Sequence, residues 1–310
     1  MKTNKRGIAW RLLAIFAVLA MVVAACGGDD GEGGSDGSDS TAAAGDGGDG
    51  SLLEELQSEG SITVGIANEI PYGYEDEETG EVTGEAPEVA RLVLGELGID
   101  NMDAQVVEFG ALIAGLQAGN FDMIAAGMYI NADRAEEILF SDPDYCILES
   151  MLVPEGNPDG LSNYNSVADT DVRLAVASGT VNVDYAVWAG IPEGQIVEFA
   201  GIEDQYDAIA AGRVDAVSGT ILTVQQHADV MEGFEALPPF PALDEAGNDI
   251  LGCGGFGFRY ENQDFRDSFN DKLNELQESG EVQTIVEEQF EVDGIADDAV
   301  DLTVEDLTGS

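Results

Sequence analysis

The stretch Phe121-Asp-Met-Ile-Ala-Ala-Gly127-Met-Tyr-Ile-Asn-Ala-Asp-Arg134 begins with a short apolar run and ends with an arginine. The apolar run predicts a buried strand, so Arg134 lies just beyond the end of that strand. The chain has only 11 basic residues against 62 acidic ones, which makes a guanidinium at this place unusual. Because a guanidinium offers a planar fork that matches a carboxylate, we expect Arg134 to bind a ligand carboxylate. The alternative is a salt bridge to one of the many acidic side chains.

Strand and helix patterns alternate along residues 51–295, which is typical of an α/β fold with mostly parallel sheets. This length fits two modest domains. Residues 118–127 and 211–220 echo each other, since both contain a helix end, a glycine, an aspartate and a buried strand, and this indicates two similar lobes. The expected strands are 61–67, 105–109, 121–126, 173–177, 196–199, 214–218 and 254–259, and the expected helices are 87–97, 111–118, 265–276 and 282–290.

The N-terminal segment predicts export. Residues 1–25 combine a basic start, an apolar run too short to span a bilayer comfortably, and small residues directly before Cys26. This order is typical of a lipoprotein signal peptide, with Cys26 as the lipid-bearing residue. The alternatives are an ordinary signal peptide with an incidental cysteine, or an uncleaved anchor. Residues 26–50 consist almost wholly of small and acidic residues and predict a lipidated, disordered linker that holds the body near the outer surface of the cell membrane.

The formal net charge of −51 excludes some partners. A surface this acidic repels nucleic acid and anionic lipid headgroups, so we expect no nucleic-acid partner. The acidic residues are dispersed, and Lys272 is the only lysine after the signal segment. This suggests exposure to high salt, which screens the self-repulsion. We expect the protein to be a monomer.

Two cysteines remain after Cys26, at positions 146 and 253. An even pair in an exported protein favours a disulfide between Cys146 and Cys253, and two buried free thiols are the alternative. Residues 291–310 are acidic and we expect them to be frayed, and 296–310 form an acidic tail.

Motifs for catalysis are absent from the sequence. The single histidine, His227, lies in a polar helical stretch, where a solvated surface position is expected. No group of residues has metal-ligand spacing, and the glycines of residues 252–257 lack the strand-to-helix setting of a phosphate loop. We therefore expect neither a metal nor a cofactor, and the sequence favours a binding protein over an enzyme.

Aromatic and polar residues follow several of the expected strands. In open α/β sheets, ligands bind beyond the carboxyl ends of the strands, so these residues predict one cleft. Thr180 would begin a helix and offer N–H donors to an anion, although a plain N-cap is the alternative. Each aromatic residue alone could be ordinary core, but together they suggest a box for a flat or cationic group. The residues concerned are Tyr72, Phe109, Tyr129, Ser178, Thr180 and Asn182.

Residues from about 52 to 290 resemble the solute-binding proteins of polar amino-acid ABC importers. The motifs that carry the resemblance are Leu53-Glu-Glu-Leu-Gln-Ser-Glu-Gly-Ser-Ile-Thr-Val-Gly65, Phe140-Ser-Asp-Pro143 and Ala177-Ser-Gly-Thr180. The resemblance implies a periplasmic-binding-protein type II fold, in which two α/β lobes are joined by two crossover strands and close on a ligand by hinge motion. It places the crossings near 145–153 and 248–258, which agrees with a disulfide there. Lobe 1 would comprise 51–150 plus 250–295, and lobe 2 would comprise 151–249.

The resemblance also implies roles for single residues. In the family, the arginine at the position of Arg134 binds the ligand carboxylate, helped by the threonine at the position of Thr180. The common amino-acid binders have an aspartate for the α-ammonium where this chain has Thr220. This departure argues against an ordinary α-amino acid as the ligand.

A finer pattern, Ala67-Asn-Glu-Ile-Pro-Tyr-Gly-Tyr74 with Gly84-Glu-Ala-Pro-Glu-Val-Ala-Arg91, is similar to the ectoine and hydroxyectoine binding proteins within that family. Their ligand is a cyclic zwitterion with a carboxylate and an amidinium-like ring. The similarity implies that Glu69 accepts hydrogen bonds from ring N–H groups while aromatic side chains enclose the cation. The expected ligand site comprises Glu69, Tyr72, Phe109, Gly127, Tyr129, Arg134, Ser178, Thr180, Asn182 and Thr220.

We therefore expect an extracytoplasmic lipoprotein that captures ectoine or hydroxyectoine and delivers it to an ABC permease. The nearest alternative is a binder of another small zwitterion, such as a basic or amide amino acid, glycine betaine or proline. Further alternatives are an enzyme on the same scaffold, similar to the cyclohexadienyl dehydratases, and a sensory module.

Overall fold

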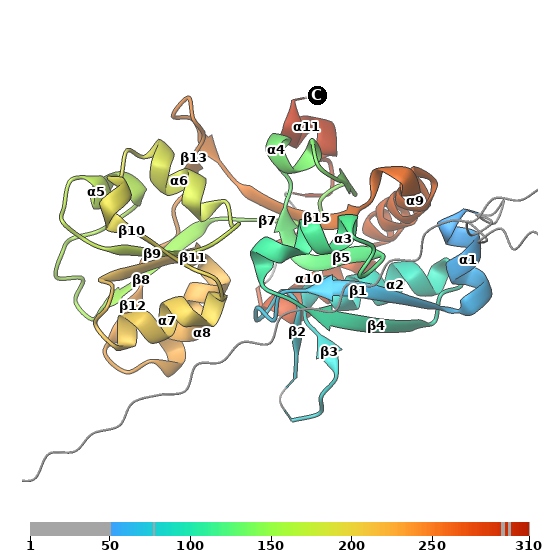
Figure 1. The fold of residues 1–310 in the computed structure, drawn as a ribbon, viewed down its shortest axis with the longest axis horizontal. Coiled ribbons are helices and arrows are strands. Elements are labelled where there is room, and N and C mark those ends of the chain that lie inside the picture. Colours follow the sequence, from blue (N-terminus) through green and yellow to red (C-terminus); the bar gives the residue numbers. More distant parts are fainter. Residues whose placement is uncertain (1–50, 77, 293–294, 297–298, 310) are drawn as a thin grey trace, which may run out of the picture. The chain divides into compact units, whose positions relative to one another are not determined.

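The computed structural model describes residues 51–309, apart from residues 77, 293–294 and 297–298. Two large sheets with their helices make up this part of the chain (Figure 1). The predicted signal peptide, the predicted linker and the predicted lipidation at Cys26 lie outside the described residues. Within the described ranges, no helix has both the length and the apolar character needed to cross a bilayer.

The first sheet contains β1 (Ser61–Ile66), β4 (Asn101–Val106), β5 (Met123–Tyr129), β6 (Leu139–Phe140), β7 (Tyr145–Ile147) and β15 (Gly252–Phe258). Its order is β4-β1-β5-β15-β6, with β7 also paired to β15. β1 is parallel to β4 and β5, whereas β15 is antiparallel to its three partners. β5 is buried along nearly its whole length because it lies inside the sheet and is apolar on both faces.

The helices that accompany this sheet are α1 (Leu52–Glu59), α2 (Glu85–Glu96), α3 (Leu112–Gln117), α4 (Ala132–Ala135), α9 (Gln263–Ser279) and α10 (Glu281–Phe290), and β2 (Tyr74–Glu75) pairs with β3 (Val82–Thr83) in a hairpin. The predicted C-terminal helices are confirmed. In α9, Phe265, Phe269 and Leu273 recur at helical spacing, and all three are buried. α9 ends at Gly280, whose φ of 84° suits glycine.

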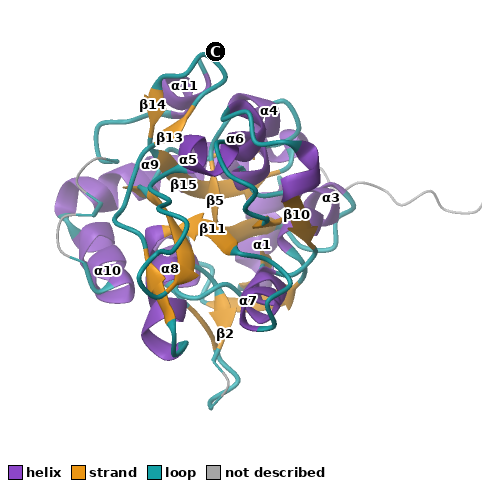
Figure 2. Ribbon diagram, turned by 90° about the vertical axis from the view of Figure 1, so that its left-hand side faces the viewer, coloured by secondary structure: helices purple, strands orange, loops and turns teal. Residues whose placement is uncertain are grey.

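The second sheet contains β8 (Glu149–Pro154), β9 (Leu174–Ala177), β10 (Ile196–Phe199), β11 (Ala216–Thr220) and β12 (Phe234–Ala236). Its helices are α5 (Tyr164–Ala168), α6 (Asn182–Trp188), α7 (Ile202–Ala210) and α8 (Ile221–Val230). The order β10-β9-β11-β8-β12 repeats the plan of the first sheet, with parallel strands first and an antiparallel strand beyond them. In both sheets, helices flank the strands (Figure 2).

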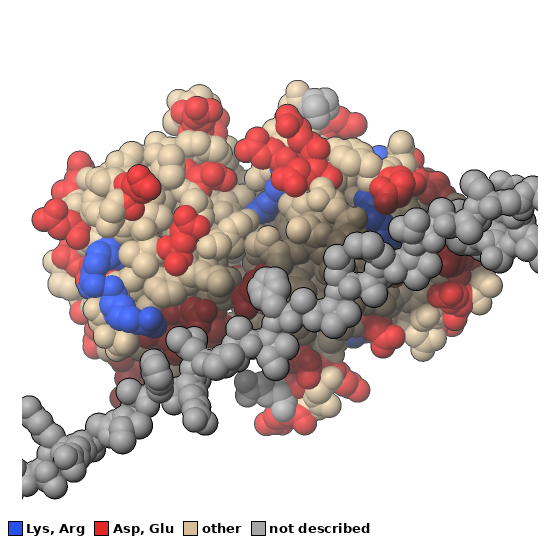
Figure 3. Space-filling model, in the orientation of Figure 1, with Lys and Arg blue, Asp and Glu red and all other residues tan. Residues whose placement is uncertain are grey.

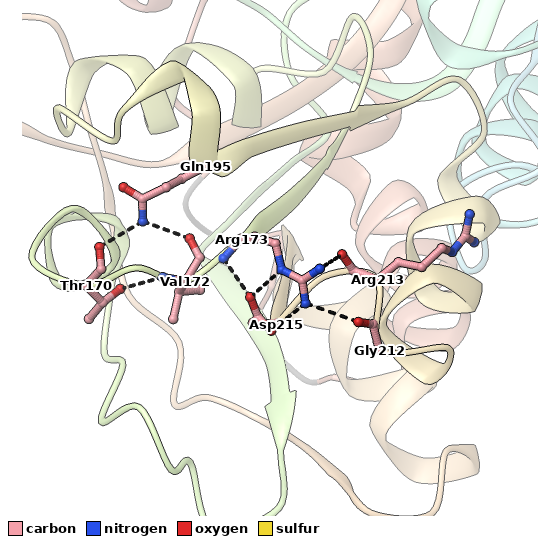
Figure 4. Close-up of polar contacts among 7 residues, drawn as sticks. All are labelled: Thr170, Val172, Arg173, Gln195, Gly212, Arg213 and Asp215. Atoms are coloured by element: carbon pink, nitrogen blue, oxygen red, sulfur yellow. Dashed lines mark hydrogen bonds and ion pairs between the residues drawn. The ribbon is translucent and has the colours of Figure 1, made fainter.

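The similarity between residues 118–127 and 211–220 corresponds to one hydrogen-bonding arrangement that occurs in both sheets. Asp122 accepts a hydrogen bond from the backbone N–H of Thr63 at 3.1 Å, which ties the start of β5 to β1. Asp215 accepts one from the backbone N–H of Arg173 at 2.9 Å, which ties the start of β11 to β9 (Figure 4). The prediction of two similar α/β lobes is confirmed. We call the first sheet with its helices lobe 1 and the second sheet with its helices lobe 2.

Two stretches of chain connect the lobes. The first passes from β7 to β8 at Leu148, and the second returns from β12 to β15 through the hairpin of β13 (Ala242–Leu243) and β14 (Asp249–Ile250). Cys146 and Cys253 lie opposite each other in the ladder between β7 and β15. A disulfide joins them, with an S–S distance of 2.07 Å.

The described residues of the C-terminal tail pack against the body, so the expectation of a frayed segment is wrong for them. The tail contains α11 (Val304–Thr308), whose N-terminus carries a capping box. The first backbone N–H of α11 donates to Asp142 at 3.0 Å. Ala299 is buried beside the disulfide, and Leu302 packs there too. Apolar residues placed among the acidic ones therefore give the tail a face that covers the two cysteines.

Candidate ligand-binding site

A cavity lies where lobe 1 meets lobe 2, and it is lined from both sides. It encloses about 490 Å³ of space outside the atoms, part of it open to solvent. The structure brings together all but one of the predicted site residues, namely Glu69, Tyr72, Phe109, Gly127, Tyr129, Arg134, Thr180, Asn182 and Thr220. The exception is Ser178, whose hydroxyl donates to Glu198 at 3.0 Å instead of lining the cavity.

Arg134 is fixed at the end of β5 by its own short helix. The side chain of Asn131 caps α4 and accepts from the backbone N–H of Arg134 at 2.8 Å. The guanidinium donates to the carbonyl of Tyr129 at 2.6 Å and, across the lobes, to the carbonyl of Gly179 at 2.9 Å. Its Cζ lies 5.4 Å from the ring centroid of Phe109. These contacts orient the fork without neutralising it.

The charge of Arg134 is buried, and no acidic side chain of the described residues forms an ion pair with it, although Asp184 is near enough to interact with it electrostatically. The residue is 8% exposed, and none of the ion pairs among the described residues includes it. Burial lowers the pKa of Arg134 to about 10. A buried charge without a counterion is costly, so this site favours an incoming anion. Among the described residues, Arg134 does not form the salt bridge to a neighbouring acid that was the alternative.

Thr180 lies just before α6, in the turn that follows β9. Its hydroxyl donates to the carbonyl of Ala177 at 2.7 Å. The helix itself begins at Asn182, so Thr180 is not the first helical residue that the sequence predicted. Gly179 touches lobe 1 in this turn: a Cβ there would lie 2.5 Å from Cα of Gly110. The turn therefore brings the two backbones into close contact at the edge of the cavity.

Glu69 supplies an anion to the same cavity. Its Oε1 accepts from the hydroxyl of Thr223 in lobe 2 at 2.9 Å. Burial raises the pKa of Glu69 to about 7, and the hydrogen bond from Thr223 opposes part of this shift. A cation placed next to Glu69 would compensate the cost of ionising it.

Tyr72 forms an apolar wall and a second contact between the lobes. Its hydroxyl donates to Oγ1 of Thr220 at 2.8 Å, and the residue is 2% exposed. Gly127 faces this ring with a φ of 59°, and a Cβ there would lie 2.5 Å from Cδ1 of Tyr72. Only glycine satisfies both the left-handed backbone and the close approach.

Two glycines of β15 support the site without lining the cavity, a role that the sequence did not reveal. A Cβ on Gly252 would lie 1.8 Å from the ring of Tyr129, and one on Gly254 would lie 2.2 Å from the ring of Tyr145. The hydroxyl of Tyr145 donates to the carbonyl of Gly127 at 2.9 Å. The glycine-rich strand therefore makes room for the tyrosines behind the cavity.

Glu149 was not predicted from the sequence, and three side chains behind the cavity donate hydrogen bonds to it. Its side chain accepts from Asn182 Nδ2 at 2.6 Å, from the Tyr129 hydroxyl at 3.3 Å and from the Tyr164 hydroxyl at 3.4 Å. Burial raises the pKa of Glu149 to about 8, and these hydrogen bonds lower it in part. A signal was present, because Glu149 is the lone acid in the apolar run of residues 145–154.

His227 is not the solvated residue that we expected. Its ring stacks on Tyr206 with centroids 3.4 Å apart and planes 6° apart, and Tyr206 lines the cavity. Its Nδ1 contacts the carbonyl of Thr223 at 2.8 Å, and its Nε2 contacts Glu203 at 3.1 Å. His227 lies on α8 and contacts Tyr206 and Glu203 of α7, so it supports the cavity wall. Across the described part of the chain, no cluster of three or more His, Cys, Asp or Glu side chains could hold a metal ion.

Comparison with known proteins gives consistent matches. The sequence model for bacterial extracellular solute-binding proteins, family 3, matches residues 62–292. A probable amino-acid ABC transporter periplasmic-binding protein, y4tE of Sinorhizobium fredii (strain NBRC 101917 / NGR234), is 38% identical over 238 residues, covering 76% of this chain and 78% of that protein. The histidine-binding periplasmic protein of Escherichia coli (strain K12) is 28% identical over 190 residues, covering 59% and 70%. The crystal structure of EhuB in complex with hydroxyectoine has a TM-score of 0.74 and 32% identity, covering 82% of this chain and 96% of that chain.

Proposed function

Because this chain belongs to family 3 of the bacterial extracellular solute-binding proteins, we propose that it captures ectoine or hydroxyectoine and delivers it to an ABC permease. Whatever the ligand, the chain is a periplasmic solute-binding protein of an amino-acid-type ABC transporter. It has the mixed α/β, two-domain fold of such proteins. The relatives are binding proteins of transporters and not enzymes, so the dehydratase alternative has no support.

The observation that carries the proposal is a cation and an anion that line one cavity without pairing with each other. Arg134 would take the ligand carboxylate, and Glu69 would take the N–H groups of a cationic ring. Tyr72, Phe109 and Tyr129 line the same cavity and would enclose the flat ring. A cyclic zwitterion satisfies all of these groups at once, and EhuB, which has a similar fold and 32% identity, was crystallised with hydroxyectoine.

A polar amino acid is the second candidate, since several relatives carry amino-acid names. An α-amino acid has a compact ammonium group, for which the resembling amino-acid binders use an aspartate at the position of Thr220. Here Thr220 is already engaged by the Tyr72 hydroxyl and caps α8. The neutral side chain at this place favours a delocalised ring cation over an α-ammonium.

The setting of the protein is part of the proposal. A lipid on Cys26 would hold the monomeric protein at the outer surface of the cell membrane, within reach of the permease. The visible face carries many acidic side chains and few basic ones (Figure 3). Such a surface suits high external salt, where screening weakens the mutual repulsion of the acids, and a compatible solute would be of use there.

Isothermal titration calorimetry on the mature body tests the proposal. The panel contains ectoine, hydroxyectoine, histidine, arginine, glutamine, glycine betaine and proline. We expect ectoine or hydroxyectoine to bind tightest, and Trp188, which lies in lobe 2 beside Tyr185, provides a fluorescence signal for binding. Tighter binding of any amino acid in the panel would reject the ectoine assignment and leave the transporter assignment in place.

A further inference from the structure

Glu149 lies one layer behind the cavity, at the point where the chain enters lobe 2. It is the first residue of β8, directly after the crossing at Leu148, and the residue is 1% exposed. None of the ion pairs among the described residues includes it. Its hydrogen-bond partners are neutral donors, and two of them, Tyr129 and Asn182, line the cavity from lobe 1 and lobe 2.

Three hydrogen bonds of the Asn182 side chain determine the orientation of its amide. Its Nδ2 lies 2.6 Å from Oε2 of Glu149, 2.9 Å from the Tyr164 hydroxyl and 3.2 Å from the Ser218 hydroxyl. An amide nitrogen has two hydrogens, so both are committed on this side. The Oδ1 atom has no hydrogen-bond partner among the described residues, and Asn182 lines the cavity.

The contact with Glu149 is the shortest of the three and favours this orientation. The hydroxyls of Tyr164 and Ser218 can donate or accept, and they would therefore satisfy either end of the amide. An ionised Glu149 can only accept, and a protonated Glu149 whose hydrogen lies on Oε1, toward the Tyr129 hydroxyl, still offers Oε2 as an acceptor, so the NH₂ end faces Oε2 in both forms. The carbonyl end of Asn182 is consequently the end presented to a ligand.

We propose that Glu149 is a positioning residue for ligand specificity, which makes Asn182 present its carbonyl oxygen to the cavity. This inference rests on the proposed function. The ligand group that meets Asn182 must then be a hydrogen-bond donor, such as a ring N–H or a hydroxyl. A ligand without any donor, such as glycine betaine, gains nothing from this oxygen.

Three variants test the positioning role by calorimetry with ectoine. Glu149→Met keeps the approximate volume but removes the acceptor, so the Asn182 amide is free to turn, and ectoine binding should weaken about tenfold or more. Glu149→Gln keeps an acceptor oxygen for Asn182 and can donate to the Tyr129 hydroxyl, so its affinity should stay within about threefold of wild type. Glu198→Met is the matched control, because Glu198 is exposed on lobe 2 and does not line the cavity.

Asn182→Leu tests the acceptor itself and remains informative if Glu149→Met does not fold. It should weaken ectoine about as much as Glu149→Met does. The proposal is overturned if Glu149→Met or Asn182→Leu binds ectoine like wild type, or if Glu149→Gln loses as much affinity as Glu149→Met. The last result would assign the effect to charge and not to the turned amide.

A ligand-free measurement separates this inference from the proposed function. In the NMR spectrum of the wild type, the side-chain NH₂ of Asn182 should exchange slowly with water, and Glu149→Met should accelerate that exchange at least about tenfold while Glu149→Gln does not. An Asn182 NH₂ signal unchanged by Glu149→Met would overturn the positioning role. If no compound of the panel binds the wild type, the ectoine proposal fails while the exchange rates still decide the role of Glu149.

Discussion

The hydroxyl of Thr223 in lobe 2 donates a 2.9 Å hydrogen bond to Glu69 in lobe 1. This bond stabilises the ionised carboxylate, whereas burial destabilises it, and burial is the larger effect. The resulting pKa of about 7 means that the ligand-free cavity holds Glu69 as a mixture of acid and carboxylate near neutral pH. The state of this one group therefore controls how well the cavity receives a cation.

Ligand affinity should depend on pH through Glu69. A cationic ring binds the carboxylate and not the acid, so affinity should be full above about pH 8 and should fall by up to about tenfold per pH unit below pH 7. Calorimetry with ectoine between about pH 8 and pH 5.5 measures this slope. Glu69→Gln should bind weakly with a nearly flat profile, whereas an equally steep profile in that variant would assign the pH dependence to another group.

The stability of the ligand-free protein should show the opposite trend. The pKa values of Glu69 and Glu149 are raised to about 7 and about 8, so the folded state retains protons that the unfolded state releases above about pH 4.5. Their contribution to the free energy of unfolding is full below about pH 4.5 and is lost as the pH rises through 7 to 8. Urea unfolding at several pH values should give a shallower decline for Glu149→Gln than for Glu198→Gln. Equal slopes would contradict the prediction.

Arg134→Ala should remove most ligand affinity, by about 2–5 kcal/mol, because the carboxylate loses a charge-assisted pair in a closed cavity. Arg134→Lys should recover only part of the loss, since an ammonium lacks the planar fork. Arg173→Ala is the control, because its guanidinium binds Asp215 in lobe 2 (Figure 4) and does not line the cavity. It should lower the melting temperature and leave the affinity for ectoine unchanged.

Gly127→Ala should damage both stability and the site. The substitution combines a φ of 59° with a Cβ placed 2.5 Å from Tyr72, so strain and overlap add, and the loss should reach about 2–4 kcal/mol. Gly119→Ala separates the two effects, since Gly119 has a φ of 72° but nothing within 4 Å of its Cβ. This control should cost only about 1 kcal/mol in thermal unfolding and should bind ectoine normally.

Gly110→Ala should hinder the approach of the lobes. Its Cβ would lie 2.9 Å from the carbonyl oxygen of Ser178, which does not yield easily because it belongs to the backbone. We expect ectoine affinity to fall about tenfold, because the overlap opposes the arrangement in which the two lobes meet. Gly194→Ala, with open space around its Cβ, is the control. An unchanged affinity for Gly110→Ala would contradict the prediction. It would show that the ligand is bound without close contact between Gly110 and the turn at Ser178.

Much of the fold could be predicted from local patterns. The apolar run before Gly127 is buried on both faces of the sheet, and such runs have few alternatives to an inner strand. The phenylalanines of α9 identified a helix by spacing alone. The tail was misjudged because its apolar residues are few and scattered. These residues are buried against Cys146 and Cys253, and both cysteines lie far from the tail in the sequence.

The site could be predicted where a residue follows a strand and has an uncommon chemistry, as Arg134 does. Glu149 could not be placed in this way, because its partners Tyr129, Asn182 and Tyr164 come from three separate segments and meet only in the folded chain. The same holds for His227, whose stacking on Tyr206 joins two different helices. Contacts of this kind depend on tertiary packing, which a single sequence does not encode locally.

The disulfide between Cys146 and Cys253 has a topological consequence. The two cysteines are separated by 107 positions, and all strands and helices of lobe 2 lie between them. Lobe 2 is therefore a covalent ring that begins and ends at a single point on lobe 1. A protease that cuts any one loop of lobe 2 opens this ring but releases no fragment, so the nicked protein would remain one molecule until its sulfurs are reduced.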